Sequence, residues 1–455
     1  MIKKLPSVAL IFSLFILLYT FYRSEIFNNG EMRSYYSIYY IISFFLILSS
    51  ISLYFLSEKM RKNIFFFSLS IIVPLYVIEI YLTSINIERI LDERTYNIPF
   101  KAKIYKEKTG KEYDRNSVIE NYIKRSKDLN ATLKISPYYH VSENYELFPI
   151  SGISNILTFY DNENGYHSEY ISDRYGFNNP DEEWENKFQE YVLIGDSLVH
   201  GCCVNRPDDM ASVLRNLSGK SVINLGYSSN GPLVELASLR EFLPNNTKKI
   251  LWFFYEGNDL SDLNYELSNN TLTKYSEDIQ FSQNLINETD KVDKILDNIL
   301  SSKINEYVDF ANESKTFKFK LIGAVKFRGI REFIRITFFQ KKPKSFDFIP
   351  DDYIYSQFKK VLQLAQYEAS LNNSKFYVIY LPQYSRYLDG FDNNNYHRIK
   401  SIVEDLDINF IDIDKEVFQK EDNPFDLYPF GLNAHFNEIG YRKISEQIYQ
   451  MTKND

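Results

Sequence analysis

The chain has 455 residues, and 52 Lys and Arg against 60 Asp and Glu give it a formal net charge of −8. This length predicts about three domains, and a content of 25% charged and 44% hydrophobic residues is typical of a folded protein. The acidic balance excludes a generic basic nucleic-acid binder, and two cysteines exclude a disulfide-stapled scaffold and a Cys-only zinc site.

Three apolar runs at the start of the chain predict a membrane anchor over residues 1–90. Residues 5–22 and 34–57 carry no charge, and each run approaches or exceeds the ~20 residues that cross a bilayer core. The third run, residues 63–78, is shorter, and it can continue past Glu79 if that carboxylate lies near the membrane interface. The alternatives are a cleaved signal peptide for the first run and a buried core helix for the third. We favour three transmembrane helices.

Basic residues in the connecting segments predict the orientation of this anchor. Lys and Arg precede the first run and separate the second from the third, whereas those between the first and second are offset by Glu25 and Glu31. Positively charged loops tend to stay in the cytoplasm. We therefore expect the N-terminus inside, three crossings of the cytoplasmic (inner) membrane, and a C-terminal domain that is extracytoplasmic, in the periplasm.

Residues 91–188 are predicted to form a polar linker that leads into the C-terminal domain. The stretch is charged and rich in turn residues, and a helix is expected near residues 116–127. Residues 172–180 combine Gly, Asn and Pro, which is typical of a turn-rich segment without regular structure.

Residues 189–455 predict an α/β domain with a doubly wound parallel sheet. Short, nearly continuous apolar strands alternate with helical patterns, as in a sheet that helices cover on both faces. In such sheets the site lies at the carboxyl ends of the strands, and we expect a helical insertion at about residues 262–350 to form a cap or rim over it. The expected strands are residues 191–194, 222–225, 250–255, 376–381 and 409–413, and the expected helices are residues 211–217, 233–242, 353–370, 396–406 and 438–451.

Four residues at the expected strand ends and helix starts are suited to acyl-transfer chemistry. Ser197 follows the first strand in a tight turn, Gly226 ends the second, Asn258 follows the third, and His435 precedes the last helix. A serine hydroxyl becomes an effective nucleophile when a base such as histidine removes its proton. The tetrahedral intermediate then needs donors around its oxyanion, which a backbone N–H at a glycine and an asparagine amide can supply.

Taken together, these blocks resemble the SGNH (GDSL) hydrolase superfamily. The resemblance implies a flavodoxin-like doubly wound fold, with Ser197 as the nucleophile and His435 as the general base. It also implies an oxyanion hole formed by the N–H groups of Ser197 and Gly226 and the amide of Asn258. It covers about residue 191 to the C-terminus, outside the insertion. The matching residues are Gly195-Asp196-Ser197, Gly226, Gly257-Asn258-Asp259 and His435.

The sequence departs from this family in two places. The family usually has an aspartate two or three residues before the histidine, where this chain has Asn433 and Leu432. The enzyme could work as a serine–histidine dyad, or another carboxylate could orient the imidazole, Asp426 being the nearest in sequence. Glu256 also stands where the family usually has a glycine, two residues before the asparagine.

Other reactive side chains have simpler structural interpretations. His200 lies on the same turn as Ser197 and is expected to point away from it. Cys202 and Cys203 are adjacent, and because consecutive Cα atoms are ~3.8 Å apart, below the usual ~4.4–6.8 Å, we expect buried packing and no disulfide. We predict neither a metal nor another cofactor, because no metal-ligand spacing links His140, His167 and His397.

The sequence therefore predicts a membrane-anchored esterase or O-acyltransferase of SGNH/GDSL type. We expect serine-dependent ester hydrolysis or acyl transfer on an acylated extracytoplasmic substrate, an envelope glycan, and no nucleic-acid partner. Residues 173–177 resemble the segment that precedes such domains in envelope polysaccharide-modifying proteins. The alternative is a catalytically weak or inactive fold that binds a glycan or serves as a scaffold in an envelope assembly, and the missing aspartate motivates it.

Overall fold

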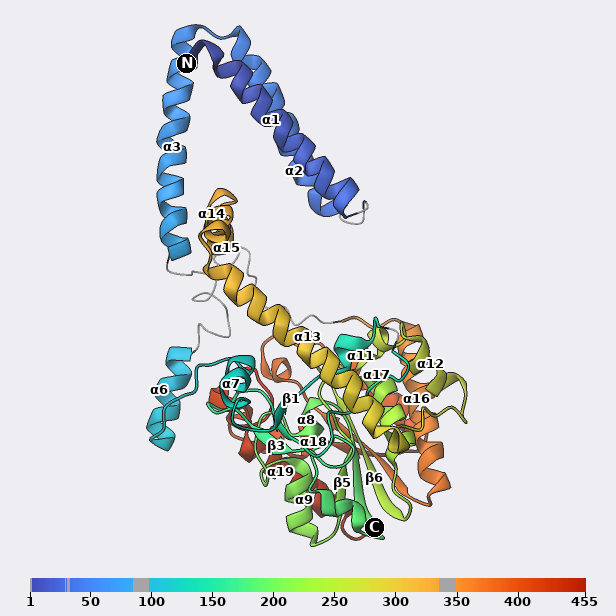
Figure 1. The fold of residues 1–455 in the computed structure, drawn as a ribbon. Helices are drawn as coiled ribbons and strands as arrows, with labels where there is room; N and C mark the ends of the chain where they lie inside the picture. The colour runs from blue at the N-terminus through green and yellow to red at the C-terminus, as the bar shows by residue number, and fades with distance from the viewer. Residues whose placement is uncertain (1, 29, 31–32, 85–97, 144, 335–347) are drawn as a thin grey trace. The chain divides into compact units, whose positions relative to one another are not determined.

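The computed structural model describes residues 2–28, 30, 33–84, 98–143, 145–334 and 348–455. The chain divides into two compact units (Figure 1). Unit 1 comprises Met1–Asp92 and Ser314–Gln340, and unit 2 comprises Glu93–Glu313 and Lys341–Asp455. The expected boundary at residue 90, between the anchor and the lead-in region, lies outside the described residues.

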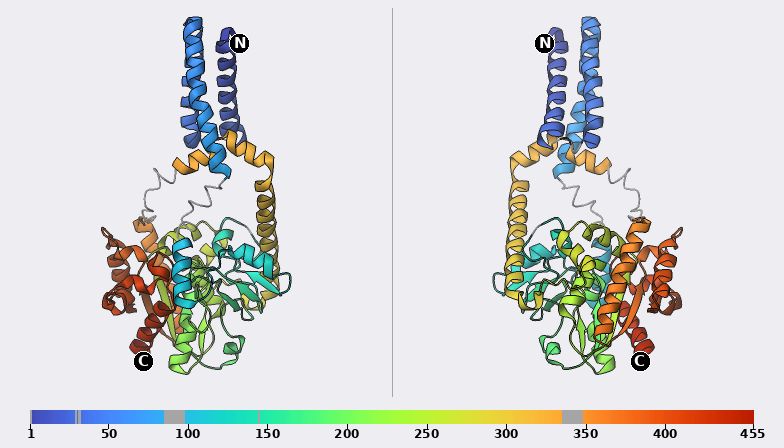
Figure 2. Two further views of the ribbon diagram at one scale, coloured as in Figure 1. Left: turned by 90° about the vertical axis from the view of Figure 1, so that its left-hand side faces the viewer. Right: turned by 90° about the vertical axis from the view of Figure 1, so that its right-hand side faces the viewer.

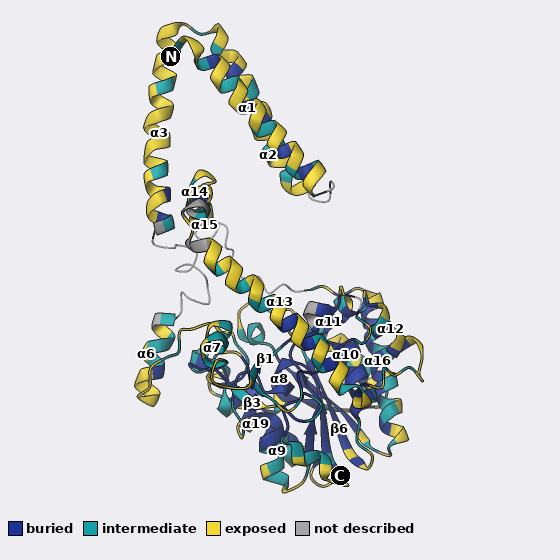
Figure 3. Cartoon of the chain, in the orientation of Figure 1, coloured by how far each residue is buried: buried dark blue, intermediate teal, exposed yellow. Residues whose placement is uncertain are grey.

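Unit 1 contains the three apolar helices that the sequence predicts. All three are long and apolar enough to cross a membrane. Most of their side chains are exposed, as the yellow colouring in Figure 3 shows. The first two pack against each other and share a hydrogen bond between the buried hydroxyls of Ser13 and Ser50, 3.0 Å apart. The helices are α1 (Leu5–Phe21), α2 (Arg33–Ser52) and α3 (Glu58–Ser84).

The core of unit 2 is a parallel sheet with the strand order β5-β4-β6-β7-β8 (Figure 1, Figure 2). This order, in which the chain starts beside one edge and then crosses to the other side, is the flavodoxin-like doubly wound arrangement. Each strand overlaps one that the sequence predicts, so the expected α/β fold is confirmed. The strands are β4 (Gln189–Ile194), β5 (Val222–Asn224), β6 (Thr247–Tyr255), β7 (Lys375–Leu381) and β8 (Asn409–Asp412).

Helices cover both faces of this sheet, and each face buries its own apolar cluster. In β4, Val192 and Ile194 enter one cluster while Tyr191 and Leu193 enter the other, as the two-residue period of a strand requires. Burial on both faces explains why the strands are apolar along their whole length. The helices on one face are α10 (Pro232–Phe242), α16 (Asp352–Leu371) and α17 (Asn394–Asp405), those on the other are α9 (Met210–Ser218) and α19 (Glu438–Thr452), and the short α18 (Ile413–Glu416) follows β8.

The region predicted as a polar linker belongs, in its described part, to unit 2, and it forms a second sheet. β1 (Ala131–Leu133) pairs in parallel with β2 (Leu157–Phe159), which pairs antiparallel with β3 (Glu169–Ile171). Strands of three residues are too short to show an alternating pattern, so the sequence analysis missed them. Helix α6 (Ile98–Thr109) precedes this sheet, and α7 (Val118–Arg125) confirms the helix expected near residues 116–127.

The turn-rich segment at residues 172–180 fastens this region to the main sheet. Asn179 exchanges two hydrogen bonds of 2.9 Å with the backbone of Asn224, the last residue of β5. The buried Asp173 carboxylate accepts four hydrogen bonds of 2.8–2.9 Å, from two backbone N–H groups and from the side chains of Asn179 and Trp184. One buried carboxylate thus makes hydrogen bonds to several points of a segment that has no regular structure.

The segment between β6 and β7 is helical, as expected, but it is divided between the two units. We expected a cap or rim over the site. The structure shows its first helices packed beside α10 and α16, and its last two helices in contact with α3 of unit 1. The helices are α11 (Asp259–Glu266), α12 (Asn270–Glu277), α13 (Thr289–Lys315), α14 (Phe317–Val325) and α15 (Arg328–Ile334).

Replacing Asp173 with alanine leaves four buried or half-buried donors without their acceptor. We expect Asp173→Ala to lower the free energy of unfolding of unit 2 by about 3 kcal/mol. Both tryptophans of the chain lie in unit 2, so their fluorescence during urea unfolding of the detergent-solubilised protein reports on this unit. The exposed Glu182→Ala is the control, and an equal, small effect of both changes would contradict the assigned role of Asp173.

Candidate active site

Ser197, the predicted nucleophile, begins helix α8 (Ser197–His200) directly after β4. The Asp196 carboxylate accepts a hydrogen bond of 2.9 Å from the N–H of Leu198 and so caps this short helix. A side chain at Gly195 would lie 2.5 Å from that of Val199, so the turn has room only for glycine. The Gly195-Asp196-Ser197 motif therefore sets the serine at the carboxyl end of the central sheet, as the sequence predicts.

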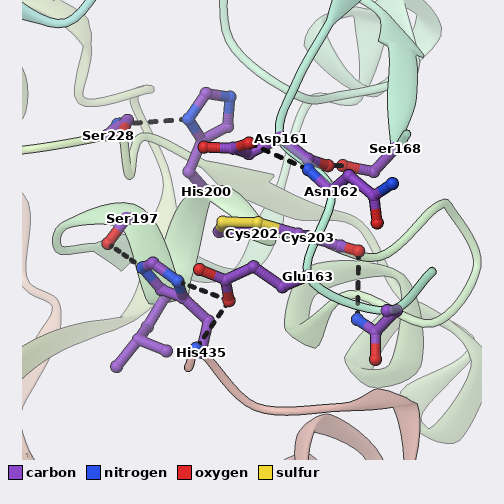
Figure 4. The surroundings of a disulfide bond; sticks show 12 residues. Asp161, Asn162, Glu163, Ser168, Ser197, His200, Cys202, Cys203, Ser228 and His435 are labelled. Carbon is purple, nitrogen blue, oxygen red and sulfur yellow. Dashed lines mark hydrogen bonds and ion pairs between the residues drawn. A yellow bond between two sulfur atoms is a disulfide. The ribbon is translucent and has the colours of Figure 1, made fainter. Parts of the chain in front are cut away.

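Three side chains from distant parts of the chain form a continuous line of hydrogen bonds (Figure 4). Ser197 Oγ lies 2.8 Å from His435 Nε2, and His435 Nδ1 lies 3.0 Å from Glu163 Oε2. The same carboxylate oxygen accepts a hydrogen bond of 2.7 Å from the backbone N–H of His435. The structure thus brings the predicted Ser197 and His435 together and adds an acid that the sequence analysis did not identify.

The Glu163 carboxylate determines the protonation pattern of His435. A carboxylate can only accept, so the imidazole proton lies on Nδ1, and Nε2 presents its lone pair to the Ser197 hydroxyl. Burial alone lowers the pKa of His435, but the charge and the hydrogen bond of Glu163 outweigh burial and raise that pKa above its ordinary value. Burial likewise raises the pKa of Glu163, and His435 more than reverses this, so that the carboxyl pKa is lowered.

The carboxylate that orients the histidine is Glu163, not Asp426. Asp426 accepts a hydrogen bond of 2.9 Å from Asn423, and its side chain is exposed. Glu163 lies in the loop between β2 and β3, 272 positions before His435 in the chain. Proximity in sequence was therefore the wrong guide, and no periodic pattern marks this loop. The structure thus places a carboxylate on the His435 imidazole although the aspartate that the family has near this histidine is missing.

Gly226 and Asn258 follow the strands on either side of β4, but both predicted oxyanion donors have partners within the protein. The N–H of Gly226 donates to Asn224 Oδ1 at 2.8 Å, and the Asn258 amide donates to Asp262 at 2.7 Å while its Oδ1 atom is buried without a partner. A side chain at Gly226 would lie 2.5 Å from Val199, so close packing on the serine turn also requires glycine here.

Glu256, which stands where the family usually has glycine, is paired rather than isolated. Its carboxylate bonds to the guanidinium of Arg386, with one contact of 2.9 Å, and it also accepts a hydrogen bond from the phenol of Tyr380. The side chains of Glu256 and Arg386 are both almost completely buried. This departure from the family pattern is therefore balanced by a cation from the segment after β7.

His200 points away from Ser197, as expected, and its two ring nitrogens have structural partners. Nδ1 accepts a hydrogen bond of 3.1 Å from the N–H of Ser228, and Nε2 lies 2.8 Å from the hydroxyl of Tyr170. The ring is stacked on that of Tyr227, with centroids 4.4 Å apart. Burial lowers the pKa of His200 well below its ordinary value, so this histidine stays neutral.

Cys202 and Cys203 form a disulfide, contrary to the sequence-based expectation. That expectation used the Cα spacing of ordinary disulfides, which does not apply to neighbouring residues that close a small ring of their own. Glu163, Cys202, Cys203 and His435 have donor atoms within 4.8 Å of one another, which is the one potential metal-binding group among the described residues. In this structure the two sulfurs form a disulfide with each other, and the His435 imidazole is hydrogen-bonded to the Glu163 carboxylate (Figure 4).

A cavity of about 720 Å³ is lined by residues that are close in sequence to Glu163 and His435. Asn164 and Asn437 line it, and these residues lie one position after Glu163 and two after His435. The rings of Tyr105, Tyr166 and Phe430 also line it, together with His167, whose Nδ1 atom is buried without a partner. Phe430 has a φ of 58°, a left-handed conformation that is uncommon for a bulky residue. The cavity thus combines aromatic faces with hydrogen-bonding groups.

Comparisons with known proteins give similarities to solved structures only. No protein-family model matches the sequence, and no match is found among curated proteins. A lipolytic protein of the G-D-S-L family from Desulfitobacterium hafniense DCB-2 is 12% identical, with a TM-score of 0.30, over 58% of this chain and 98% of that chain. An acetyl xylan esterase is 11% identical, with a TM-score of 0.30, over 58% of this chain and 98% of that one.

The contact between Glu163 and His435 predicts how Ser197 reacts with a fluorophosphonate as pH changes. Only neutral His435 can accept the serine proton, so labelling rises as pH passes the pKa of the imidazole. Glu163→Gln removes the charge that raises this pKa and offers an amide donor to Nδ1. We expect labelling to slow by about 10²- to 10⁴-fold and its acidic midpoint to move to lower pH. Asp426→Asn is the matched control. If labelling slowed in Asp426→Asn but not in Glu163→Gln, the carboxylate that orients His435 would be Asp426 and not Glu163.

Proposed function

We propose that this protein is a membrane-anchored serine esterase or O-acyltransferase. The observation that carries this proposal is the line of hydrogen bonds from Ser197 through His435 to Glu163 at the carboxyl end of β4. A nucleophile, a base within hydrogen-bond reach and a group that orients the base are the three parts that serine-dependent acyl transfer needs. The resemblance of residues 195–197, 226, 257–259 and 435 to SGNH (GDSL) hydrolases supports the same chemistry.

In the proposed first half-reaction, His435 Nε2 takes the proton of Ser197 while Oγ attacks the ester carbonyl carbon. The tetrahedral intermediate collapses, the bond to the alcohol oxygen breaks, and His435 returns the proton to that oxygen. Glu163 stabilises the imidazolium that exists between these two steps. In the second half, His435 deprotonates water or an acceptor hydroxyl as it attacks the acyl-serine. The bond between the acyl carbon and Ser197 Oγ then breaks, His435 returns the proton to Oγ, and the acid or the new ester leaves.

The oxyanion would be bound by the N–H groups of Ser197 and Gly226 and by the Asn258 amide. An amide has two N–H bonds, so Asn258 can keep its hydrogen bond to Asp262 and direct the other N–H toward an oxyanion. The Gly226 N–H must share its hydrogen or leave Asn224 Oδ1, which lies 2.8 Å away. We therefore expect the Asn258 amide and the Ser197 N–H to stabilise the oxyanion more than the Gly226 N–H does.

The proposed substrate is an acylated glycan of the cell envelope. The three apolar helices associate the protein with a membrane, and we propose that they cross the inner membrane with the N-terminus inside, which places unit 2 in the periplasm. The cavity lined by Asn164 and Asn437 supports a sugar ligand, because aromatic faces such as those of Tyr166 and Phe430 can stack on sugar rings while asparagine and histidine side chains hydrogen-bond to hydroxyls.

The role of the serine and histidine is tested with p-nitrophenyl acetate and the full chain in detergent. We expect Ser197→Ala and His435→Ala each to lower turnover by about 10³-fold or more, while Asp426→Asn retains it. Turnover that survives Ser197→Ala would exclude this residue as the nucleophile. If the wild type is inactive as well, fluorophosphonate labelling distinguishes an unreactive serine from an unsuitable ester.

The cavity predicts a separate effect on substrate binding. Phe430→Ala removes an aromatic face of this cavity and leaves Ser197, His435 and Glu163 unchanged, so we expect a higher KM for an O-acetylated oligosaccharide, by about 10-fold, and an unchanged kcat/KM for p-nitrophenyl acetate. Steady-state kinetics with both esters measure this difference. Equal losses on the two substrates would indicate a disturbed triad and would contradict a binding role for the cavity.

A further inference from the structure

The last two helices of the insertion, α14 and α15, pack against the third apolar helix, α3. The carboxylate of Glu79 in α3 is fully buried and accepts hydrogen bonds of 2.8 Å from the N–H groups of both Gly329 and Ile330 in α15. A side chain at Gly329 would lie 2.9 Å from Leu82, so α15 approaches α3 closely. The rings of Tyr76 and Phe327 also meet, with centroids 4.5 Å apart. The carboxylate that interrupts the apolar run of α3 thus receives its hydrogen bonds from α15.

These two helices are basic in an acidic chain. From residue 317, where α14 begins, to residue 334, where α15 ends, the sequence has five Lys or Arg residues and a single acidic one, whereas the chain as a whole has a net charge of −8. Ion pairs within the segment therefore cannot neutralise it. The basic residues are Lys318, Lys320, Lys326, Arg328 and Arg331, and the acidic one is Glu332.

The same two helices expose large apolar side chains. Val325 is 59% exposed, and the others are exposed by 39% or more. A short helical segment that is both apolar on its surface and strongly basic is typical of elements that lie in the interface of a bilayer with anionic lipids. The exposed apolar residues are Leu321, Ile322, Val325, Phe333 and Ile334.

The contact with α3 places this segment at one end of that helix. Glu79 lies five residues before Ser84, where α3 ends, which corresponds to about 7–8 Å along a helix axis. Lys59, Arg61 and Lys62 lie at the opposite end. If α3 crosses a bilayer, α14 and α15 therefore lie near the face at which the chain leaves toward unit 2.

We propose that α14 and α15 form a lipid-binding hairpin whose partner is the anionic surface of the bilayer that α3 crosses. Its apolar side chains enter the interface, and its Lys and Arg side chains bind phosphate groups of the lipids. Helix α13 begins in the core of unit 2, where Val292 and Leu296 are buried, and it runs directly to this hairpin. The catalytic unit is then connected to the membrane at two places in the chain. This inference rests on the proposed membrane crossing, and it does not depend on the esterase activity.

The test places an environment-sensitive fluorophore on a new cysteine, Val325→Cys, in the full chain reconstituted into phosphatidylcholine vesicles with or without phosphatidylglycerol. Cys202 and Cys203 are buried and joined in a disulfide, so labelling without a reductant is selective for the new thiol. Val308→Cys in α13, whose side chain is also exposed, is the matched control. Vesicles that contain brominated lipids then report the contact of each fluorophore with lipid.

We expect blue-shifted emission and several-fold stronger quenching by brominated lipid at position 325 than at position 308. We also expect Lys326→Glu combined with Arg331→Glu to reduce this quenching in vesicles with phosphatidylglycerol. Equal quenching at the two positions would overturn the proposal, as would blue-shifted emission without quenching, which would indicate a protein partner. Quenching that is insensitive both to phosphatidylglycerol and to charge reversal would overturn the assignment of an anionic surface. Tryptophan fluorescence and turnover of p-nitrophenyl acetate in the same vesicles verify that each variant is folded.

Discussion

The contact between Glu163 and His435 is the interaction on which the candidate site depends. One carboxylate oxygen binds both the backbone N–H and the imidazole Nδ1 of the same histidine. The backbone bond fixes the position of the loop before α19, and the side-chain bond fixes the orientation of the ring. Together they place Nε2 within 2.8 Å of Ser197 Oγ. A loop from the small sheet therefore completes a site whose other two members follow β4 and precede α19.

This constraint gives the region before β4 a function. The β2–β3 loop can carry an acid to the site only if the small sheet is held firmly against the large one. Asp173 and Asn179 supply that attachment through hydrogen bonds to their own segment and to the end of β5. The sequence predicts a linker here, whereas in the structure this region supplies the carboxylate that holds the His435 imidazole.

The elements that could be predicted from the sequence are those whose burial requires an uninterrupted run of apolar residues. The strands of the large sheet are apolar throughout because both faces are covered, and the motif around Ser197 follows from the limited space for Gly195 beside Val199. A residue whose partner lies far away in the sequence could not be predicted in this way. Glu163 lies in a loop between three-residue strands, and nothing local distinguishes its carboxylate from that of Asp426. Pairing of Cys202 with Cys203 was missed because a rule for distant cysteines was applied to adjacent ones.

The insertion illustrates a third limit. Its helical content was predictable, but the partner of α14 and α15 was not, because their contact with Glu79 joins residues 250 and 251 positions apart. The same contact explains why an apolar helix contains a carboxylate. In the proposed account, unit 1 and the hairpin contact the membrane and unit 2 carries out the chemistry, with α13 as one covalent connection between them.

The central claim is that Ser197 is acylated during turnover. The most direct measurement is mass spectrometry of the peptide that contains Ser197 after the full chain is mixed with p-nitrophenyl acetate and quenched in acid within milliseconds. The account predicts an acetyl group on Ser197 that forms as p-nitrophenol is released and disappears as the ester is exhausted. Release of p-nitrophenol without acylation of Ser197, or with acylation at another residue, would contradict it.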